Sequence, residues 1–216
     1  MHVLLTAGPT YEPLDPVRFL GNRSTGKMGY ALAEAFAAQG AAVTLVSGPS
    51  HLPDPASPRI RTVRVETAAE MFAAAAAVAP VADVWVFAAA VADYRPAQVA
   101  VDKIKKTGAT LTLELVKNVD IAATLGLSKR PEQFAVGFAL ETTNELAHAQ
   151  DKLRRKNFDL IVLNSLRDAG AGFGHDTNKV TVLDAAGQIV NFELQSKADV
   201  ARGLVGLILT YLIPAP

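Results

Sequence analysis

The segment Gly21-Asn-Arg-Ser-Thr-Gly-Lys-Met-Gly29 decides the fold class of this chain. It follows an apolar run at residues 3–7, which stops at Gly8-Pro9 and predicts a buried strand. Apolar residues at helical spacing continue through residues 27–39, and Gly40 then provides a C-terminal cap. Residues 42–46 predict a second strand. A strand, a glycine-rich turn, a helix and a strand in that order predict an α/β unit.

The same alternation continues to the C-terminus. Further strands are expected at residues 59–65, 84–88, 110–115, 134–140, 158–163, 178–183 and 189–194. Further helices are expected at residues 67–80, 118–125, 142–156 and 196–211, two of them opened by the capping boxes Thr67–Glu70 and Thr142–Glu145. We expect one domain, residues 1–216: a Rossmann-like, doubly wound, mostly parallel sheet with helices on both faces and an appended β-hairpin.

Composition excludes several classes of protein. The 216 residues are half hydrophobic and include no cysteine, which excludes disulfide scaffolds, zinc–thiolate sites and a cysteine nucleophile. Lysine plus arginine equals aspartate plus glutamate, so no basic field for nucleic acid is expected. The longest apolar run, residues 204–213, is too short for a membrane span, and residues 1–5 lack signal-peptide features. A cytoplasmic protein is therefore expected.

The unusual segments of the sequence follow the predicted strands. They comprise residues 8–29, 47–58, 89–106, 141–143 and 164–179. In open α/β sheets, ligands bind beyond the carboxyl ends of the strands. The sequence therefore predicts one ligand site along this edge of the sheet.

The segment at residues 21–29 has the composition of an anion site. Its glycines let the backbone approach a ligand, the helix N-terminus favours negative charge, and Lys27 adds a cation. It matches the pattern GxxxxGK, but Met28 stands where a P-loop has Ser or Thr, and GxGxxG is absent. We expect phosphate binding; the alternative is a glycine-rich helix start with a lysine in solvent.

Two other segments suit a nucleotide. In Ala88-Ala-Ala-Val-Ala-Asp-Tyr-Arg-Pro96, the small residues leave room for a planar ring, and Asp93 is placed to accept from a ribose hydroxyl; the alternative is a tight packing site with a capping aspartate. Lys103, Lys105 and Lys106 repel one another unless an anion neutralises them, which suits a lid over a polyphosphate. The alternative is a solvated charge run.

Lys152 and Lys156 lie four residues apart and share one helix face. Because Arg154 and Arg155 adjoin them, spacing alone favours an ordinary basic surface helix. The four histidines show no ligand spacing. No metal site made of side chains is predicted, although Mg²⁺ held by phosphate oxygens would leave little trace in a sequence.

Taken together, the motifs resemble one family. GNRSTGKMG, AAAVADYRP, KIKK, KNVDI at residues 117–121 and GFALET at residues 137–142 occur in this order. This is similar to the bacterial phosphopantothenate–cysteine ligases, the synthetase domain of the bifunctional protein of coenzyme A biosynthesis. The specific likeness covers residues 3–156.

The resemblance implies an activity. The family joins 4′-phosphopantothenate to L-cysteine with CTP and Mg²⁺, through an acyl-cytidylate, and releases CMP and pyrophosphate. It implies that Asn22 acts on the intermediate in the second step and that Lys103 stabilises charge in the first, within a lid that includes Lys105 and Lys106. It further implies that CTP is bound by a larger set: Ser24, Gly26, Phe87, Ala88, Ala89, Asp93, Lys103, Val119, Asp120, Ile121, Ala122, Phe138, Lys152 and Lys156.

The resemblance also implies partners. A homodimer is expected, with residues 178–194 as part of its interface, and a decarboxylase domain or subunit accompanies many relatives. Two other functions stay open from the residues alone. One is a nicotinamide-dependent oxidoreductase, against which the missing GxGxxG argues. The other is a non-catalytic nucleotide-binding subunit, which would need neither a lid nor Asn22.

Overall fold

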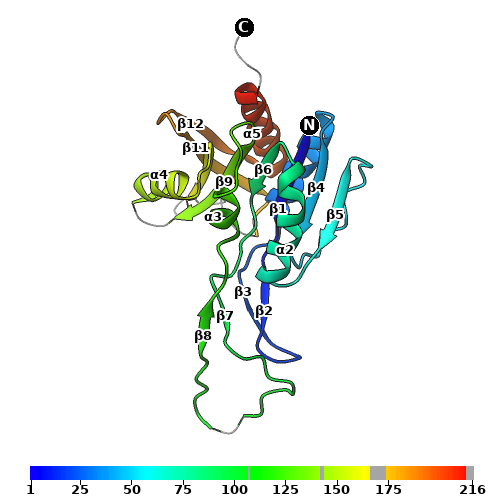
Figure 1. Ribbon diagram of the computed structural model, residues 1–216, viewed down its shortest axis with the longest axis vertical. Coiled ribbons are helices and arrows are strands. Elements are labelled where there is room, and N and C mark those ends of the chain that lie inside the picture. Colours follow the sequence, from blue (N-terminus) through cyan, green and yellow to red (C-terminus); the bar gives the residue numbers. More distant parts are fainter. Residues whose placement is uncertain (107, 142–143, 166–173, 213–216) are drawn as a thin grey trace.

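The computed structural model describes residues 1–106, 108–141, 144–165 and 174–212, and its centre is an eight-stranded sheet (Figure 1). Along the sheet the strands run β12-β11-β10-β9-β6-β1-β4-β5. Their bounds are β1 His2–Ala7, β4 Ala42–Ser47, β5 Ile60–Arg64, β6 Val84–Phe87, β9 Phe134–Glu141, β10 Leu160–Ser165, β11 Thr177–Asp184 and β12 Ile189–Ser196. The helices are α1 Lys27–Ala38, α2 Ala68–Val78, the 3₁₀ turn η1 Ala79–Val81, α3 Ile121–Gly126, α4 Glu145–Arg155 and α5 Lys197–Leu212.

Six neighbouring strands of the sheet are all parallel, in the order β5, β4, β1, β6, β9 and β10, and this order is that of a doubly wound fold. The chain starts at β1, moves outward through β4 and β5, then crosses back to β6 and continues to β9 and β10. The order therefore reverses between β1 and β6. Such a switch point opens a crevice at the carboxyl ends of the two strands. The predicted α/β class and the mostly parallel sheet are confirmed.

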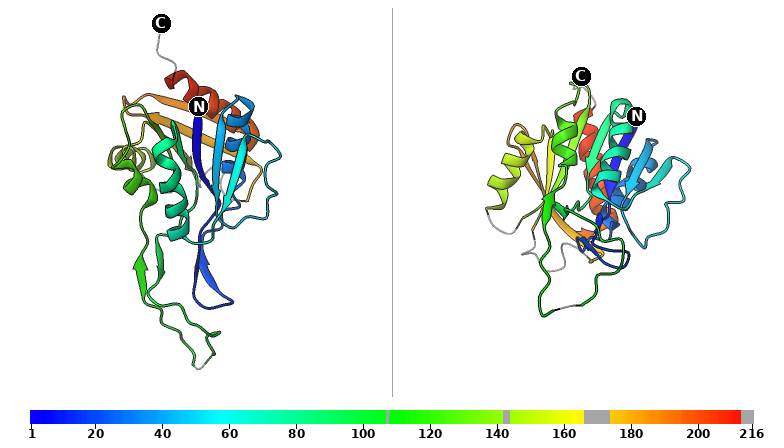
Figure 2. Two further views of the ribbon diagram at one scale, coloured as in Figure 1. Left: turned by 45° about the vertical axis from the view of Figure 1, so that its right-hand side comes forward. Right: turned by 60° about the horizontal axis from the view of Figure 1, so that its bottom comes forward.

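Helices cover both faces of the sheet (Figure 2). On one face, α1 and α5 bury Phe36 and Leu204 against β1, β4 and β6. On the other face, α2, α3 and α4 bury Met71, Leu125 and Leu153 around Trp85. Burial of apolar side chains on both sides explains why the central strands are continuous apolar runs.

The start of α1 is shaped by two glycines. Gly26 precedes the helix with φ 82°, a conformation that favours glycine. Gly29 lies so close to β1 that a Cβ atom there would stand 2.4 Å from the Cβ of Ala7. The motif therefore brings the N-terminus of α1 directly to the end of β1.

The predicted hairpin at residues 178–194 extends the main sheet. β11 pairs antiparallel with β10, and β12 pairs antiparallel with β11 and forms the sheet edge. Gly187, with φ 86°, lies in the turn between the two strands. The hairpin is thus appended to the edge of the main sheet.

Two ribbons project from the carboxyl edge of the sheet as one arm (Figures 1 and 2). The first pairs β2 Tyr11–Pro13 with β3 Phe19–Gly21, and the second pairs β7 Tyr94–Pro96 with β8 Leu115–Lys117. We define the arm as residues 11–21, 94–106 and 108–117. The sequence did not predict these ribbons.

The strand expected at residues 110–115 is wrong, because pairing begins only at Leu115. Apolar and polar residues alternate there, but the apolar side chains have no sheet to pack against: Leu111 and Leu113 are 58% and 36% exposed. The helix expected at residues 118–125 begins instead at Ile121, where the carboxylate of Asp120 accepts from the backbone N–H of Ala123.

Capping boxes were predicted at the starts of two helices, α2 and α4. The capping box of Thr67 and Glu70 is confirmed, with both reciprocal hydrogen bonds present. At α4, the helix begins at Glu145 after Asn144, and the predicted cap residue Thr142 lies outside the described residues, as does Thr143.

Candidate active site

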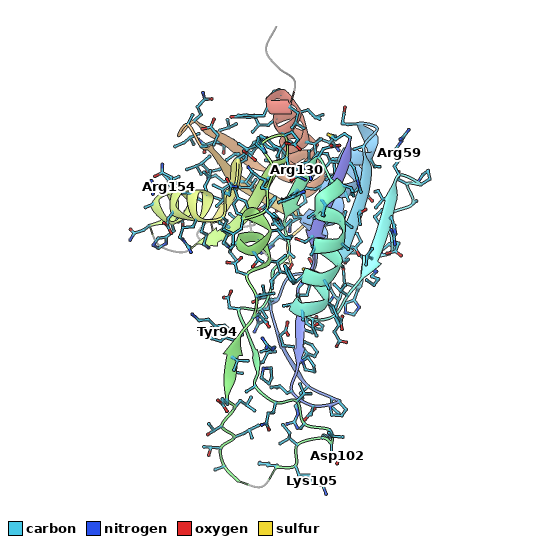
Figure 3. The ribbon with its side chains drawn as sticks, in the orientation of Figure 1. Arg59, Tyr94, Asp102, Lys105, Arg130 and Arg154 are labelled. Carbon is cyan, nitrogen blue, oxygen red and sulfur yellow. The ribbon has the colours of Figure 1, made fainter. Side chains whose placement is uncertain are left out.

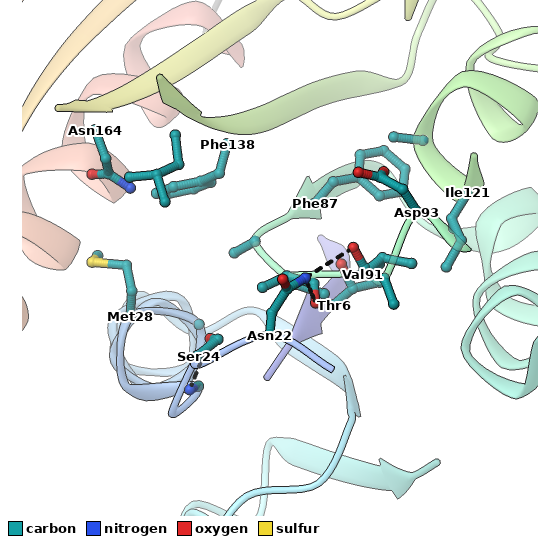
Figure 4. A pocket seen from close by; sticks show the side chains of 18 of the residues that line it. Thr6, Asn22, Ser24, Met28, Phe87, Val91, Asp93, Ile121, Phe138 and Asn164 are labelled. Atoms are coloured by element: carbon teal, nitrogen blue, oxygen red, sulfur yellow. Dashed lines mark hydrogen bonds between the residues drawn. The ribbon is translucent and has the colours of Figure 1, made fainter. Parts of the chain in front are cut away.

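A pocket of about 400 Å³ opens at the switch point, between the end of β6, the N-terminus of α1 and helices α3 and α4 (Figure 4). Met28 and Asn164 lie on one side of it, and Asp93 and Ile121 on the other (Figure 4). The lining consists of residues 6, 22, 24–29, 87–93, 118–122, 138, 140, 152, 156, 158, 164, 178 and 197. The pocket therefore gathers residues from three of the five segments that the sequence placed beyond the strands, 8–29, 89–106 and 164–179, whereas 47–58 and the described residue Glu141 contribute none of its lining.

Asn22 fastens two loops together at the pocket. Its side-chain amide donates to the carbonyl oxygens of Ala90, at 2.9 Å, and Val91, at 3.1 Å (Figure 4). Asn118 holds the same loop from the other side, donating to the carbonyl of Ala92 at 2.8 Å. Because the amide nitrogen of Asn22 is fixed in this way, its amide oxygen is left to accept from a ligand.

The α3 and α4 side of the pocket combines apolar walls with a charged pair. Phe87, Val119 and Ile121 supply flat or small apolar surface suited to a planar ring. Lys156 donates to Asp120 at 3.0 Å. Burial of Asp120 opposes its ionisation, but the hydrogen bond from Lys156 and that from the backbone of Ala123 outweigh burial and lower its pKa.

The α1 side is polar and cationic. Lys27 donates to Asp176 at 2.6 Å, which lowers the pKa of that carboxyl group. Lys197, the first residue of α5, is 8% exposed and donates to the carbonyl of His175. Burial lowers the pKa of Lys197, the charge of Lys27 lowers it further, and Asp176 opposes both.

The structure brings most of the predicted site residues into this pocket. The residues that line it are Asn22, Ser24, Gly26, Phe87, Ala88, Ala89, Asp93, Val119, Asp120, Ile121, Ala122, Phe138, Lys152 and Lys156. Their individual roles stay predictions. Lys152 and Lys156 do not form an ordinary surface patch, because both reach the pocket from the end of α4.

The three lid lysines are not brought to the pocket. Lys103, Lys105 and Lys106 are exposed, and none of them is among the residues that line the pocket. Their loop lies at the tip of the arm, where Figure 3 labels Lys105. The backbone between them is held there. Ile104 donates its N–H to Asp15 at 3.1 Å, and its carbonyl accepts from Arg18 at 2.7 Å.

The polar residues of the pocket that sequence reasoning missed include Asn118, Asn164, Asn178 and Lys197. Asn118 lies within the motif KNVDI, so its position carried a signal. Asn164 and Asn178 bound the segment 164–179 that was expected beyond a strand end, so their positions carried a weaker signal, whereas Lys197 at a helix start carried none. Asn178 donates to Asn164 at 3.0 Å, a contact made only by pairing of these strands.

This geometry already fits the family named by the motifs. The model of the family described as the DNA/pantothenate metabolism flavoprotein C-terminal domain matches residues 1–212. The chain belongs to this family. The fold and pocket described above are therefore those of a family member, and the resemblance drawn from five short motifs is confirmed at the level of the family.

Two curated relatives are close to 50% identical to this chain over the aligned residues. The coenzyme A biosynthesis bifunctional protein CoaBC of Bacillus subtilis (strain 168) is 48% identical over 93% of this chain and 49% of its own length. A protein named cysteine/cysteine sulfinic acid decarboxylase, from an unknown prokaryotic organism, is 50% identical over 96% of the chain and 58% of its own length. The chain thus spans about half the length of the curated relatives it matches.

A solved structure agrees with this family assignment. The crystal structure of the C-terminal domain of a coenzyme A biosynthesis bifunctional protein CoaBC superposes with a TM-score of 0.82 at 43% identity, covering 98% of this chain and 95% of that one. In the part of the chain that the structure describes, no helix is both long and apolar enough to cross a bilayer.

Proposed function

We propose that this chain is a CTP-dependent phosphopantothenate–cysteine ligase domain. The observation that carries the proposal is the gathering of the family's motif residues in one pocket at the switch point, on a chain that is 43% identical to the CoaBC C-terminal domain. The substrates would be 4′-phosphopantothenate, L-cysteine and CTP, taken as its Mg²⁺ complex. We place the reaction in the cytoplasm.

Two displacements make the amide bond. In the first, a carboxylate oxygen of 4′-phosphopantothenate attacks the α-phosphorus of CTP, the bond to the β-phosphate oxygen breaks, and pyrophosphate leaves. In the second, the amine of cysteine attacks the acyl carbon, loses a proton, and expels CMP. The first step is needed because hydroxide is a poor leaving group. It converts the carboxylate into an acyl-cytidylate, from which CMP leaves readily.

The pocket suits this chemistry. The apolar α3 side suits the base, and Asp93 suits a ribose hydroxyl. Ser24, Gly26, Lys152 and Lys156 would provide donors and cations for phosphates, whose charge accumulates in both steps. The amide oxygen of Asn22 would orient the intermediate. Among the described residues, no group of three or more His, Asp or Glu side chains is placed to hold a metal, so Mg²⁺ would arrive on the phosphates of CTP.

Lys103 can take part in the reaction only if the tip of the arm moves toward the pocket. In this structure it stands at the arm tip, so we propose that the loop carrying Lys103, Lys105 and Lys106 moves toward a bound nucleotide. A decarboxylase domain or subunit would consume the product, in keeping with the bifunctional name of the relatives.

We also propose a homodimer. The hairpin leaves Ile189, Val190 and Leu194 exposed at the sheet edge. The arm leaves a larger exposed apolar set, which comprises Val17, Phe19, Tyr94, Val99, Val101, Leu111, Leu113 and Leu115. Because a patch this large on a projecting ribbon is typical of an interface, we favour the arm as the surface that meets a second copy.

The test of the ligase proposal is pyrophosphate release by the purified protein, given Mg²⁺, 4′-phosphopantothenate and either CTP or ATP, with and without cysteine. We expect release that requires 4′-phosphopantothenate, prefers CTP, and becomes multiple-turnover when cysteine is added. Release with neither nucleotide, while CTP still binds, would favour a non-catalytic nucleotide-binding subunit. A loss of absorbance at 340 nm with reduced nicotinamide cofactor would favour an oxidoreductase.

A further inference from the structure

The four strand ends at the base of the arm converge on one loop of the pocket. We call residues 90–93 the root loop; all of them line the pocket, beyond the end of β6. The residues that adjoin these strand ends are Thr10 before β2, Asn22 after β3, Asp93 before β7 and Asn118 after β8. Asp93 belongs to the root loop, and each of the other three makes a hydrogen bond to it. The arm is therefore joined directly to a wall of the pocket.

Thr10 and Asn118 hold the second half of the root loop from two directions. The hydroxyl oxygen of Thr10, a fully buried residue, accepts from the backbone N–H of Ala92 at 3.0 Å. The side-chain amide of Asn118 donates to the carbonyl oxygen of Ala92 at 2.8 Å. The backbone N–H of Asn118 donates to the carbonyl oxygen of Asp93, also at 2.8 Å. Asn118 thus fixes the backbone of Asp93, the residue whose carboxylate we expect to meet a ribose hydroxyl.

Arg95, in β7, connects Asn118 to the arm. Its Nη1 atom donates to the carbonyl oxygen of Lys117 at 2.9 Å and to Oδ1 of Asn118 at 3.3 Å. An asparagine amide has one oxygen that accepts and one nitrogen that donates. Because Arg95 binds the oxygen, the nitrogen is turned toward the root loop, where it donates to Ala92. Arg95 itself is exposed and is not among the residues that line the pocket, so its effect on a ligand passes through the residues it contacts.

We propose that Arg95 is a positioning residue for the nucleotide: it orients Asn118, which holds the root loop in the conformation that binds the ribose. A side chain that contacts a ligand is placed accurately only when neighbouring hydrogen bonds fix it, and Arg95 and Asn118 supply such bonds from the arm. The strand ribbon that leads to the lysine loop therefore also shapes the pocket wall. The nucleotide as ligand rests on the proposed function; the link from Arg95 to the root loop rests on the contacts alone.

Amide hydrogen exchange, followed by NMR, tests this link without any ligand. The backbone N–H groups of Ala92 and Asn118 report on the root loop, because each donates to one of its contacts. In Arg95→Gln we expect both groups to exchange about fivefold faster than in the wild type, since one ordinary hydrogen bond is lost. Arg95→Lys keeps a cationic donor without the planar fork, and it should recover part of the protection.

Calorimetric titration with CTP, in the absence of 4′-phosphopantothenate, tests the effect on the pocket without turnover. We expect Arg95→Gln to weaken CTP binding about fivefold, by the same loss of one hydrogen bond. Asn118→Ala should weaken it at least as much. The double variant should bind CTP no more weakly than Asn118→Ala, because Arg95 acts through Asn118 and the two losses are not additive.

Arg59→Gln is the matched control. Arg59 is also exposed, and its Nη1 atom also donates to a backbone carbonyl oxygen, that of Gly40 at 3.2 Å. It lies just before β5, at the edge of the sheet opposite the arm, and does not line the pocket (Figure 3). Its variant should keep both the exchange rates of Ala92 and Asn118 and the affinity for CTP.

Unchanged exchange and unchanged CTP affinity in Arg95→Gln would overturn the proposal. Faster exchange with unchanged CTP affinity would also overturn it, because Arg95 would then only brace the arm. Additive losses in the double variant would show that Arg95 does not act through Asn118. These outcomes are separate from those of the ligase assay. A wild type that ligates, with a KM for CTP unaffected by Arg95→Gln, refutes the positioning role alone. A wild type that never releases pyrophosphate, but binds CTP more weakly after Arg95→Gln, refutes the ligase alone.

Discussion

At the scale of single residues, Asn22 has two tasks that the structure separates. Its amide nitrogen holds the loop at Ala90 and Val91, and its amide oxygen is available to a ligand. Asn118 performs only the first kind of task in the structure, from the opposite side of the same loop. The two asparagines therefore offer a matched pair for separating loop anchoring from an action on the intermediate.

We expect Asn22→Asp to release pyrophosphate in a single turnover and to form product at least about a hundredfold more slowly, since it adds a negative charge beside the acyl carbonyl, where negative charge develops in the second step. Rapid quench measurement of pyrophosphate and product in the same reaction checks this. Asn118→Asp, which loses a comparable anchor, should slow both steps together. If the two variants behave alike, Asn22 acts only by holding the loop.

At the scale of elements, the turn between β2 and β3 holds the lysine loop in place. Asp15 has a side chain that is fully buried, and it accepts from Arg18 and from the backbone of Ile104. Burial opposes the ionisation of Asp15, but hydrogen bonds from Arg18, Val17 and Ile104 outweigh burial and lower its pKa. The contribution of these hydrogen bonds to stability is therefore fully present above the pKa of an aspartate in the unfolded chain, which is about 3.9. It is lost only as the pH falls toward the lower pKa of Asp15 in the folded protein.

We expect Asp15→Ala to release this loop at neutral pH, because Ile104 then loses its acceptor and Arg18 loses its charged partner. Limited digestion with trypsin, followed by mass spectrometry, should show cleavage after Lys103, Lys105 and Lys106 several-fold faster than in the wild type. Asp54→Ala, which breaks the exposed pair with Arg64, is the control. Equal cleavage of all three proteins would show that Asp15 does not hold the loop.

At the scale of the whole molecule, the arm is hard to explain in a lone chain. It projects from the body (Figure 1). Both ribbons carry exposed apolar residues. Tyr11 and Phe19 stack at 3.8 Å within it, yet Phe19 stays 49% exposed. Covering these side chains with a second copy would remove apolar surface from water, at about 25 cal/mol for each Å².

We expect Val101→Asp to shift the protein from dimer to monomer at micromolar concentration, because it places a charge in the proposed apolar interface. Sedimentation equilibrium measures this. Leu127→Asp is the matched control: Val101 is 90% exposed on the arm, and Leu127 is 89% exposed on the body. Ile189→Asp tests the hairpin. Dissociation by Ile189→Asp alone would place the interface at the sheet edge instead.

The sequence by itself determined the features that depend on local pattern. Continuous apolar runs alternating with helical spacing gave the parallel sheet, and the box of Thr67 and Glu70 located the start of α2. The motif at residues 21–29 determined that α1 begins against β1, since its glycines alone permit that approach. Family motifs also indicated most of the pocket lining.

The tertiary structure alone decided what depends on contacts between distant segments. Lys27 and Lys197 are separated by most of the chain and line one pocket only because α1 and α5 cover the same face of the sheet. Asn164 and Asn178 meet through antiparallel pairing. The lysine loop stands at the arm tip because Asp15 and Arg18 hold Ile104 there. Periodicity reports which face of an element is buried; which elements meet is set by the order of strands and the packing of layers.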